Sequence, residues 1–182
     1  FTLSRKDPAY VGLAKEIHKA QEALMDGKDP VTVKPELAEI MDEIHVQFPQ
    51  AANDNIGFGS TIFAVKPGDG SAREQAASCQ KVLGGWANIA NEYATKRYRS
   101  NLINWGMLPF VIPDGDLPFT NHDYLFFPGI RKAVEEKAAE ITGYVVDANG
   151  LKPFTVTLGE LTDEERQIIL KGCLINYNRV EK

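Results

Sequence analysis

The chain has 182 residues, of which 43% are hydrophobic and 25% are charged, and its formal net charge is −5 at pH 7. A chain of this length can bury a core of its own, and the length fits one domain with an attachment or two small domains. The acidic balance argues against a protein dedicated to the phosphate backbone of nucleic acids, because such proteins present a basic face that displaces counterions.

The cysteine content and the hydropathy of the chain argue against further classes of protein. Cys79 and Cys173 lie far apart and form no C-x-x-C pair, so neither can hold a metal cluster alone. The lack of a disulfide framework fits a reducing compartment, and we expect a cytoplasmic protein. No apolar run approaches the roughly 20 residues that span a bilayer, so no membrane partner is expected. Since the opening FTLSRKDPAY has neither an initiator Met nor a secretory pattern, we expect a piece of a longer protein or a separate subunit.

Two helices are expected first. In residues 7–26, Asp7 can cap a helix, Pro8 suits its first position, and apolar residues recur at helical spacing. A second helix should run from about residue 35 to about residue 47. The stretch FPQAANDNIGFGS then reads as a linker. We therefore predict an N-terminal helical segment with a linker over residues 1–55 and a main domain over residues 56–182.

Short strands and helices alternate in the main domain. STIFAVK and GGWANIA have the β-branched and apolar content of buried strands, and LPFVIP is a third candidate. Helical composition covers residues 71–83 and 93–105, between these strands. This order predicts an α/β core with at least partly parallel strands.

The last third of the chain predicts a hairpin and a helix. GYVVDANGLKPFTVTL reads as two strands around an Asn149–Gly150 turn, which is a strong hairpin signal. The final helix should begin at Thr162, with Glu165 three residues later completing a capping box.

The stretch GDGSAREQAA, residues 68–77, permits two interpretations. Ser71 followed three residues later by Glu74 matches a capping box, which is an ordinary helix start. Alternatively, Gly68 and Gly70 let the backbone approach a ligand, and the N-terminus of the following helix favours an anion. Arg73 is mildly unfavourable in a first helical turn. Its planar guanidinium suits a carboxylate or a phosphate, although an exposed arginine paired with an acid remains the other interpretation.

The two common nucleotide motifs do not fit this stretch. The third glycine of G-x-G-x-x-G would fall at Arg73, and no Gly-Lys-Ser/Thr follows. A small carboxylate ligand is therefore favoured over a nucleotide.

GDGSAREQAA and the later LGGWANIANEYATKRYRSNLINWGMLPF together resemble the C-terminal swivel domain of the aconitase superfamily. Members of that superfamily carry G-x-G-S-S-R-E-x-A-A, a Gly-Gly turn, and an F-A-R-I-x-x-x-N-L-like helix that ends in G-x-L-P. The match covers residues 60–112, whereas residues 1–55 show no such resemblance. It implies an aconitase-like swivelling β/β/α domain, here with an N-terminal helical extension.

The resemblance implies part of a hydro-lyase that dehydrates and rehydrates a hydroxy di- or tricarboxylic acid at a [4Fe–4S] site. Ser71 matches the serine whose alkoxide takes the proton from carbon, and Arg73 matches the arginine that binds a substrate carboxylate. Gly70 and Ala72 flank the serine as substrate-binding positions. A helix N-terminus with glycine N–H groups and an arginine is the kind of preorganised positive site that lowers the cost of an alkoxide.

The chain departs from the family pattern at several points. Ala72 replaces the second serine of the motif, Lys96 takes the place of the arginine in F-A-R-I, and no R-G-H-L-D-N-like segment is found. In the family the three cluster cysteines lie in other domains, so we expect no metal ligands here and a chain that is inactive by itself. The expected partners are the remaining aconitase-type domains, in the same polypeptide or in a large subunit, and a small carboxylic acid.

A second function is left open, namely a non-catalytic anion-binding or RNA-regulatory module of the same fold. Ala72 and the missing upstream arginine favour it. The basic run Lys96-Arg97-Tyr98-Arg99 offers a tyrosine for stacking on a base. Because these residues point in different directions on a helix, we expect a solvated or domain-facing surface instead. Surface or packing roles are expected for His18, His45 and His122, and core positions for Trp86 and Trp105.

Overall fold

The computed structural model describes residues 2–179, with the side chains of residues 2 and 3 left out of the description. Four short or medium helices come first: α1 (Thr2–Lys6), α2 (Tyr10–Met25), the 3₁₀ turn η1 (Pro30–Thr32) and α3 (Leu37–Gln47). The α2 helix begins later than predicted, because Asp7 forms a turn in which its side-chain oxygen accepts from the backbone N–H of Ala9 at 3.1 Å. No helix within residues 2–179 has the length and apolar character needed to cross a bilayer.

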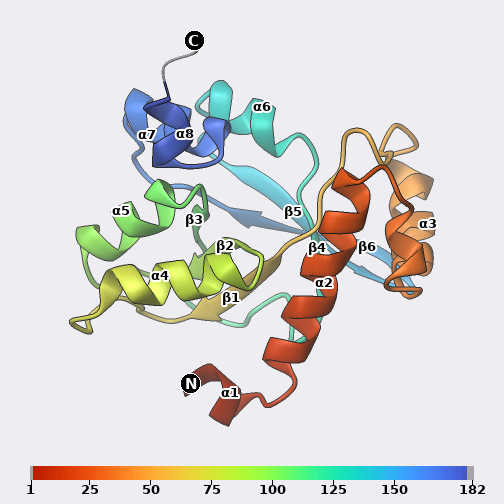
Figure 1. Ribbon diagram of the computed structural model, residues 1–182, viewed down its shortest axis with the longest axis horizontal. Coiled ribbons are helices and arrows are strands. Elements are labelled where there is room, and N and C mark those ends of the chain that lie inside the picture. The colour runs from red at the N-terminus through yellow and green to blue at the C-terminus, as the bar shows by residue number, and fades with distance from the viewer. Residues whose placement is uncertain (1, 180–182) are drawn as a thin grey trace.

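A three-stranded parallel sheet forms the centre of the main domain (Figure 1). Its strands β1 (Ser60–Ala64), β2 (Gly85–Ala90) and β3 (Leu108–Val111) lie in the order β1-β2-β3. The helices α4 (Arg73–Val82) and α5 (Lys96–Asn104) connect them and pack side by side on one face of the sheet. The predicted strand–helix alternation and parallel pairing are thus confirmed, and α5 begins at Lys96 because Thr95 caps it.

An antiparallel sheet lies beyond the other face. Its strands β4 (Tyr124–Phe126), β5 (Ile141–Asp147) and β6 (Gly150–Val156) lie in the order β4-β5-β6. The predicted hairpin is confirmed by the pairing of Asp147 with Gly150. Three helices complete this part, α6 (Ile130–Glu135), α7 (Asp163–Lys171) and α8 (Leu174–Tyr177), and α7 begins with the predicted capping box. Strand β4 and helix α6 were not predicted.

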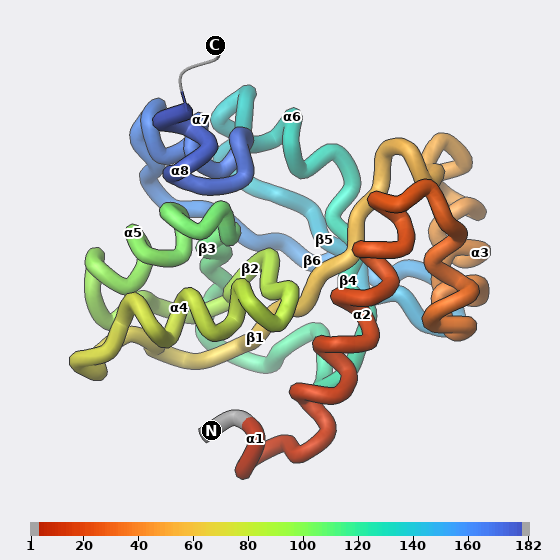
Figure 2. The backbone as a smooth tube through the Cα atoms, viewed as in Figure 1, coloured from red at the N-terminus to blue at the C-terminus, as the bar shows by residue number. Residues whose placement is uncertain are grey.

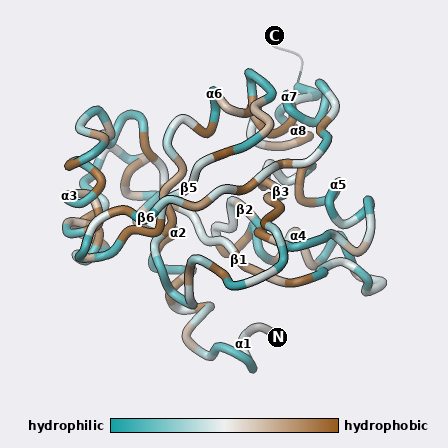
Figure 3. Tube along the Cα trace, turned by 180° about the vertical axis from the view of Figure 1, so that it is seen from behind, coloured by the Kyte–Doolittle hydropathy of each residue, from teal (hydrophilic) through white to brown (hydrophobic). Residues whose placement is uncertain are grey.

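Two hydrophobic clusters hold the three layers together. The larger one joins β2 and β3 to β5 and β6, and its centre includes Phe110, which is fully buried and stacks on Phe127 at a centroid distance of 4.7 Å. A smaller cluster under α4 and α5 contains Ala77, Tyr98 and Leu102. Figure 3 shows hydrophobic residues on strands of both sheets and on the helices that cover them. The layers are therefore helix, parallel sheet and antiparallel sheet, which confirms the expected β/β/α architecture.

The N-terminal helices lie at one side of this arrangement (Figure 2). Helix α3 packs on β5 and β6 through a third cluster that contains Met41, Ile44 and Val146. Helix α2 lies against β1, where the Gln21 side-chain oxygen accepts from the backbone N–H of Phe58 at 2.7 Å. The division of the chain at residue 55 stays a prediction, although these contacts attach the N-terminal helices firmly to the main domain.

Candidate functional site

The predicted site lies on the loop of residues 65–72, at the carboxyl end of β1. This loop runs beside residues 91–95, which follow β2, and the two are joined by a hydrogen bond of 3.0 Å from the backbone N–H of Glu92 to the Val65 carbonyl. Lys66 and Glu92 add an exposed ion pair at 2.8 Å. Both loops lead into helices, so the N-termini of α4 and α5 lie at the carboxyl edge of the parallel sheet. This is the edge at which open α/β sheets bind ligands.

The Gly68 carbonyl is the point at which the loop is fixed. It accepts one hydrogen bond from Arg73 Nε at 3.0 Å and another from Thr95 Oγ1 at 2.9 Å. The same Thr95 hydroxyl accepts from the backbone N–H of Tyr98 at 3.2 Å and thereby caps α5. Gly68 has a φ of +100°, a conformation that glycine adopts at little cost. One carbonyl thus connects the loop to the first turns of both helices.

Ser71 does not form the capping box that its spacing with Glu74 suggests. The residue at the N-cap of α4 is Ala72, and no side chain caps this helix. Glu74 instead accepts a hydrogen bond of 3.1 Å from the indole N–H of Trp105. The Ser71 side chain is exposed and makes no hydrogen bond with the described residues. The capping interpretation is therefore wrong, and the hydroxyl is left available for other contacts.

Arg73 is half-buried, and within residues 2–179 its guanidinium forms a hydrogen bond through Nε alone. Its Nε is engaged by Gly68, whereas its terminal nitrogens have no hydrogen-bond partner within residues 2–179. Lys96 begins α5, is exposed and forms no ion pair with the described residues. Two cationic side chains that form no ion pair with the described residues, together with two helix N-termini, make this edge suited to an anion.

The two glycines of the loop differ in what they contribute. A Cβ atom added to Gly68 would lie 2.4 Å from Tyr98 Cβ, so the loop approaches α5 too closely for any side chain at this position. A Cβ atom on Gly70 would meet no atom within 4 Å. Gly70 and Ala72 are both exposed on either side of Ser71. At Gly68 the loop backbone therefore lies close to the protein itself. That the backbone at Gly70 lies close to a ligand stays a prediction.

The basic run at the start of α5 does not present one continuous surface. Tyr98 is 2% exposed, which excludes stacking of a base on its ring. Arg99 donates to the carbonyls of Leu158 and Glu160 at 3.1 and 2.6 Å and therefore ties α5 to the segment before α7. Lys96 and Arg97 are the exposed members of the run.

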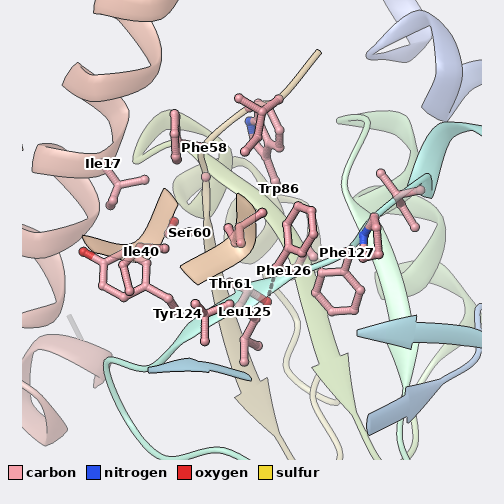
Figure 4. Close-up of a pocket in the computed structure, with 18 of the residues that line it drawn as sticks. Ile17, Ile40, Phe58, Ser60, Thr61, Trp86, Tyr124, Leu125, Phe126 and Phe127 are labelled. Atoms are coloured by element: carbon pink, nitrogen blue, oxygen red, sulfur yellow. Dashed lines mark hydrogen bonds between the residues drawn. The ribbon is translucent and has the colours of Figure 1, made fainter. Parts of the chain in front are cut away.

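A cavity of about 770 Å³ lies at the opposite, amino end of the parallel sheet. Figure 4 shows Phe58, Trp86, Phe126 and other apolar side chains around it. Trp86 is 41% exposed, so the expectation that it belongs to the core is wrong. The cavity is bounded by the N-terminal helices, the segment of residues 55–61 and β4, and no residue of the Ser71 loop lines it.

A charged group at this cavity is satisfied within the protein. The buried Lys34 ammonium lies 2.8 Å from Glu16 and 3.0 Å from Glu36, and the Tyr124 hydroxyl donates to Glu36 at 3.2 Å. Burial alone would lower the pKa of Lys34, but its hydrogen bonds to the two carboxylates outweigh burial and raise that pKa. Burial also raises the pKa of Tyr124 to about 12. Sequence reasoning missed this group because its members lie up to 108 positions apart along the chain, from residue 16 to residue 124.

No set of ligands for a metal cluster is present in the described residues. No three His, Cys, Asp or Glu side chains within residues 2–179 lie close enough together to hold a metal ion. Cys79 is exposed on α4, Cys173 is half-buried before α8, and both are free thiols. His122 pairs with Asp7 at 2.6 Å, and this hydrogen bond lowers the pKa of Asp7. A [4Fe–4S] cluster therefore does not fit any site in this part of the chain.

Residues 41–115 match the sequence profile of the family described as the aconitase C-terminal domain. The match begins in α3 and ends just after β3, so it contains the Ser71 loop, the parallel sheet and the helices α4 and α5. No curated protein matches the chain.

Proposed function

Because residues 41–115 match the aconitase C-terminal domain, we propose that the chain is the swivel part of an aconitase-family hydratase. In this proposal the enzyme removes and adds water on a hydroxy di- or tricarboxylic acid. Ser71 is the base, and Arg73 binds a substrate carboxylate. The observation that carries the proposal concerns two side chains at the start of α4. Within residues 2–179 the Ser71 hydroxyl has no partner, and two positions later the Arg73 guanidinium is fixed through Nε while its terminal nitrogens are free.

The local electrostatics support Ser71 as a base. A serine alkoxide is strongly disfavoured in water, and fixed positive groups aimed at the developing charge lower that cost. Ser71 lies just before the N-terminus of the ten-residue helix α4, and Arg73 is two positions away. The serine oxygen would take a proton from the carbon next to a carboxylate, and the C–O bond on the neighbouring carbon would break. Arg73 would meanwhile hold a carboxylate through two parallel N–H···O bonds.

The remaining catalytic groups belong to partner domains. The leaving hydroxyl needs an acceptor, and the described residues supply no metal site for it. We therefore assign the [4Fe–4S] cluster expected for the complete enzyme to other aconitase-type domains, in the same polypeptide or in a large subunit. Ser71 and Ala72 are exposed, as a site completed by another domain requires. A cytoplasmic location stays a prediction.

The test uses the complete enzyme, with the cluster-bearing domains and reconstituted with iron and sulfide. Hydration of aconitate-like acids is measured for wild type, Ser71→Ala and Arg73→Lys. We expect Ser71→Ala to lower kcat by about 10²–10⁴-fold, the usual contribution of a positioned base, and Arg73→Lys chiefly to raise KM. Ser78→Ala is the matched control, because Ser78 lies on the same helix and its hydroxyl bonds, among the described residues, only to the Gln75 carbonyl. Unchanged turnover in Ser71→Ala would exclude the serine as the base.

One observation favours the non-catalytic alternative. Arg73 and Lys96 lie at the starts of α4 and α5 and form no ion pair with the described residues, while Ala72 lacks the hydroxyl found at this position in the family. Two results together would support an anion-binding module. The isolated chain would bind citrate with an affinity that Arg73→Gln weakens and the remote Arg5→Gln does not, and the complete enzyme would show no turnover. Salt-sensitive RNA binding that depends on Lys96 would instead support the regulatory form of this alternative.

A further inference from the structure

Tyr98 lies buried beneath the Ser71 loop, and its hydroxyl joins three elements of the fold. Tyr98 is on α5 and accepts hydrogen bonds from Gln80 Nε2 on α4 at 3.0 Å and from Asn88 Nδ2 on β2 at 2.7 Å. The three residues are 2%, 8% and 1% exposed, respectively. The Asn88 side-chain oxygen has no hydrogen-bond partner among the described residues, so this amide depends on Tyr98 for its one hydrogen bond. The two amides therefore fix the position of the phenol ring.

The ring in turn supports the loop at Gly68. A Cβ atom at Gly68 would lie 2.4 Å from Tyr98 Cβ, 2.6 Å from Cγ and 2.7 Å from Cδ1. The glycine backbone thus rests directly on the base of the tyrosine side chain. Any displacement of the ring toward the loop moves Gly68, because a close-packed contact has no slack.

Gly68 is also the residue that orients the guanidinium of Arg73. Its carbonyl accepts from Arg73 Nε and also from Thr95 Oγ1. A continuous set of contacts therefore runs from the Asn88 amide, through the Tyr98 ring and the Gly68 backbone, to Arg73.

We propose that Tyr98 is a positioning residue for the anion site: its hydroxyl, held by Gln80 and Asn88, places the Gly68 carbonyl that orients Arg73. The proposal rests on the function proposed above, in which Arg73 binds a carboxylate. Tyr98 touches neither substrate nor reacting atoms and acts through Gly68. Replacing it with phenylalanine removes the oxygen that both amides share. The Asn88 amide then loses its one hydrogen bond, and the Gln80 amide keeps only its bond of 3.0 Å to the Ala76 carbonyl. An unpaired polar group of this kind is costly in a protein interior. Without these two hydrogen bonds the amides no longer hold the ring, and we expect it to shift against Gly68, which packs on ring atoms Cγ and Cδ1.

Tyr93 provides a matched control. Its ring lies 6.3 Å from that of Tyr98 and packs against the same hydrophobic cluster. Its hydroxyl donates to the carbonyls of Phe110 and Asn88 at 2.9 and 3.3 Å, and it makes no hydrogen bond to the loop. Tyr93→Phe therefore removes a phenolic hydroxyl from the same cluster without touching Gly68.

The first measurement is the ¹H–¹⁵N resonance of the Arg73 Nε–H group in the 182-residue chain. We expect Tyr98→Phe to shift this resonance and to speed its hydrogen exchange about tenfold, the equivalent of one weakened hydrogen bond. Tyr93→Phe should leave it unchanged. An unchanged Arg73 resonance in Tyr98→Phe overturns the proposal. An equal change of that resonance in Tyr98→Phe and Tyr93→Phe overturns it as well, because a general loosening of the hydrophobic cluster would produce such an equal change. If Tyr98→Phe does not fold, Gln80→Met must produce a smaller shift in the same direction, and no shift overturns the proposal.

The second measurement is the affinity of the chain for citrate. We expect Tyr98→Phe to raise the Kd about five- to tenfold, as loss of one charge-assisted contact would, and Tyr93→Phe to leave it unchanged. If Arg73→Gln does not alter citrate affinity, the carboxylate role of Arg73 in the proposed function is wrong. The resonance measurement still decides whether Tyr98 positions Arg73, so the two failures are distinguishable.

Discussion

Gly68→Ala tests whether the loop is held against α5 as tightly as the contacts require. The added Cβ would lie 2.4 Å from Tyr98 Cβ, an atom fixed to the helix backbone that cannot rotate away. Relief of such overpacking typically costs about 1–3 kcal/mol. The φ of +100° adds about 1–2 kcal/mol for a residue with a side chain. We therefore expect the free energy of unfolding to fall by about 2–5 kcal/mol, a large part of the total for a single domain.

Gly70→Ala is the matched control in the same Gly-Asp-Gly stretch. Its Cβ would meet no atom within 4 Å, and Gly70 lies outside the left-handed region of φ. A Gly→Ala change at a permissive position stabilises by about 0.4–1 kcal/mol, because it restricts the unfolded chain. We therefore expect Gly70→Ala to be neutral or slightly stabilising.

Urea denaturation followed by far-ultraviolet circular dichroism measures both variants against wild type. The ¹H–¹⁵N resonance of Arg73 Nε reports in parallel whether the Gly68 carbonyl has moved. A loss below about 1 kcal/mol for Gly68→Ala, smaller than either contribution alone predicts, would refute the reasoning. Equal losses for the two alanine variants would refute it as well, since the two sites differ in both space and φ.

Two further predictions concern the helix starts and the buried ammonium. Ser71→Ala should change the free energy of unfolding by less than about 0.5 kcal/mol, because the Ser71 side chain does not cap α4. Thr95→Ala should lower it by about 1–2 kcal/mol, because the α5 cap and the hydrogen bond to the Gly68 carbonyl are both lost. Equal losses in urea denaturation would contradict this assignment. The hydrogen bond from Lys34 lowers the pKa of Glu36 in the folded protein below its ordinary 4.5. Near that pH the unfolded chain therefore binds more protons than the folded protein does. Glu36 thus contributes stability above pH 4.5, and this contribution is lost as the pH falls through the lower folded pKa. Lys34→Met should therefore weaken the fall in stability between pH 5 and pH 3 in urea titrations, and an unchanged slope would show that Lys34 does not set this pKa.

The strands and the C-terminal hairpin were predictable because their signals are local. Short apolar runs between glycine and proline residues identified β1, β2 and β3, and the Asn149–Gly150 turn identified β5 and β6. Strand β4 has three residues and no alternation of its own. It was missed because it is a strand only through its pairing with β5, a partner that begins 15 residues after it ends, at residue 141.

The two capping boxes show how far a spacing rule extends. Thr162 and Glu165 form the predicted box at α7, where Thr162 has an extended backbone that directs its hydroxyl to the third N–H group of the helix. Ser71 and Glu74 have the same spacing, but α4 begins two residues after the serine, and Glu74 is engaged by Trp105 from 31 positions away. A local pattern therefore predicts a cap only where no distant side chain competes for its members.

The candidate site was likewise predictable in part. The sequence by itself determined that Gly70, Ser71, Ala72 and Arg73 follow a strand on a glycine-containing loop, because turn chemistry and the resemblance reside in adjacent residues. It was wrong on the burial of this strand, since β1 contains no buried residue. Only the tertiary structure decided that Gly68 rests on Tyr98, that its carbonyl engages Arg73 and Thr95, and that the Ser71 hydroxyl is free. The physical reason is that Gln80, Asn88 and Tyr98 lie on three different elements, and their hydrogen bonds exist only once α4, β2 and α5 have packed together.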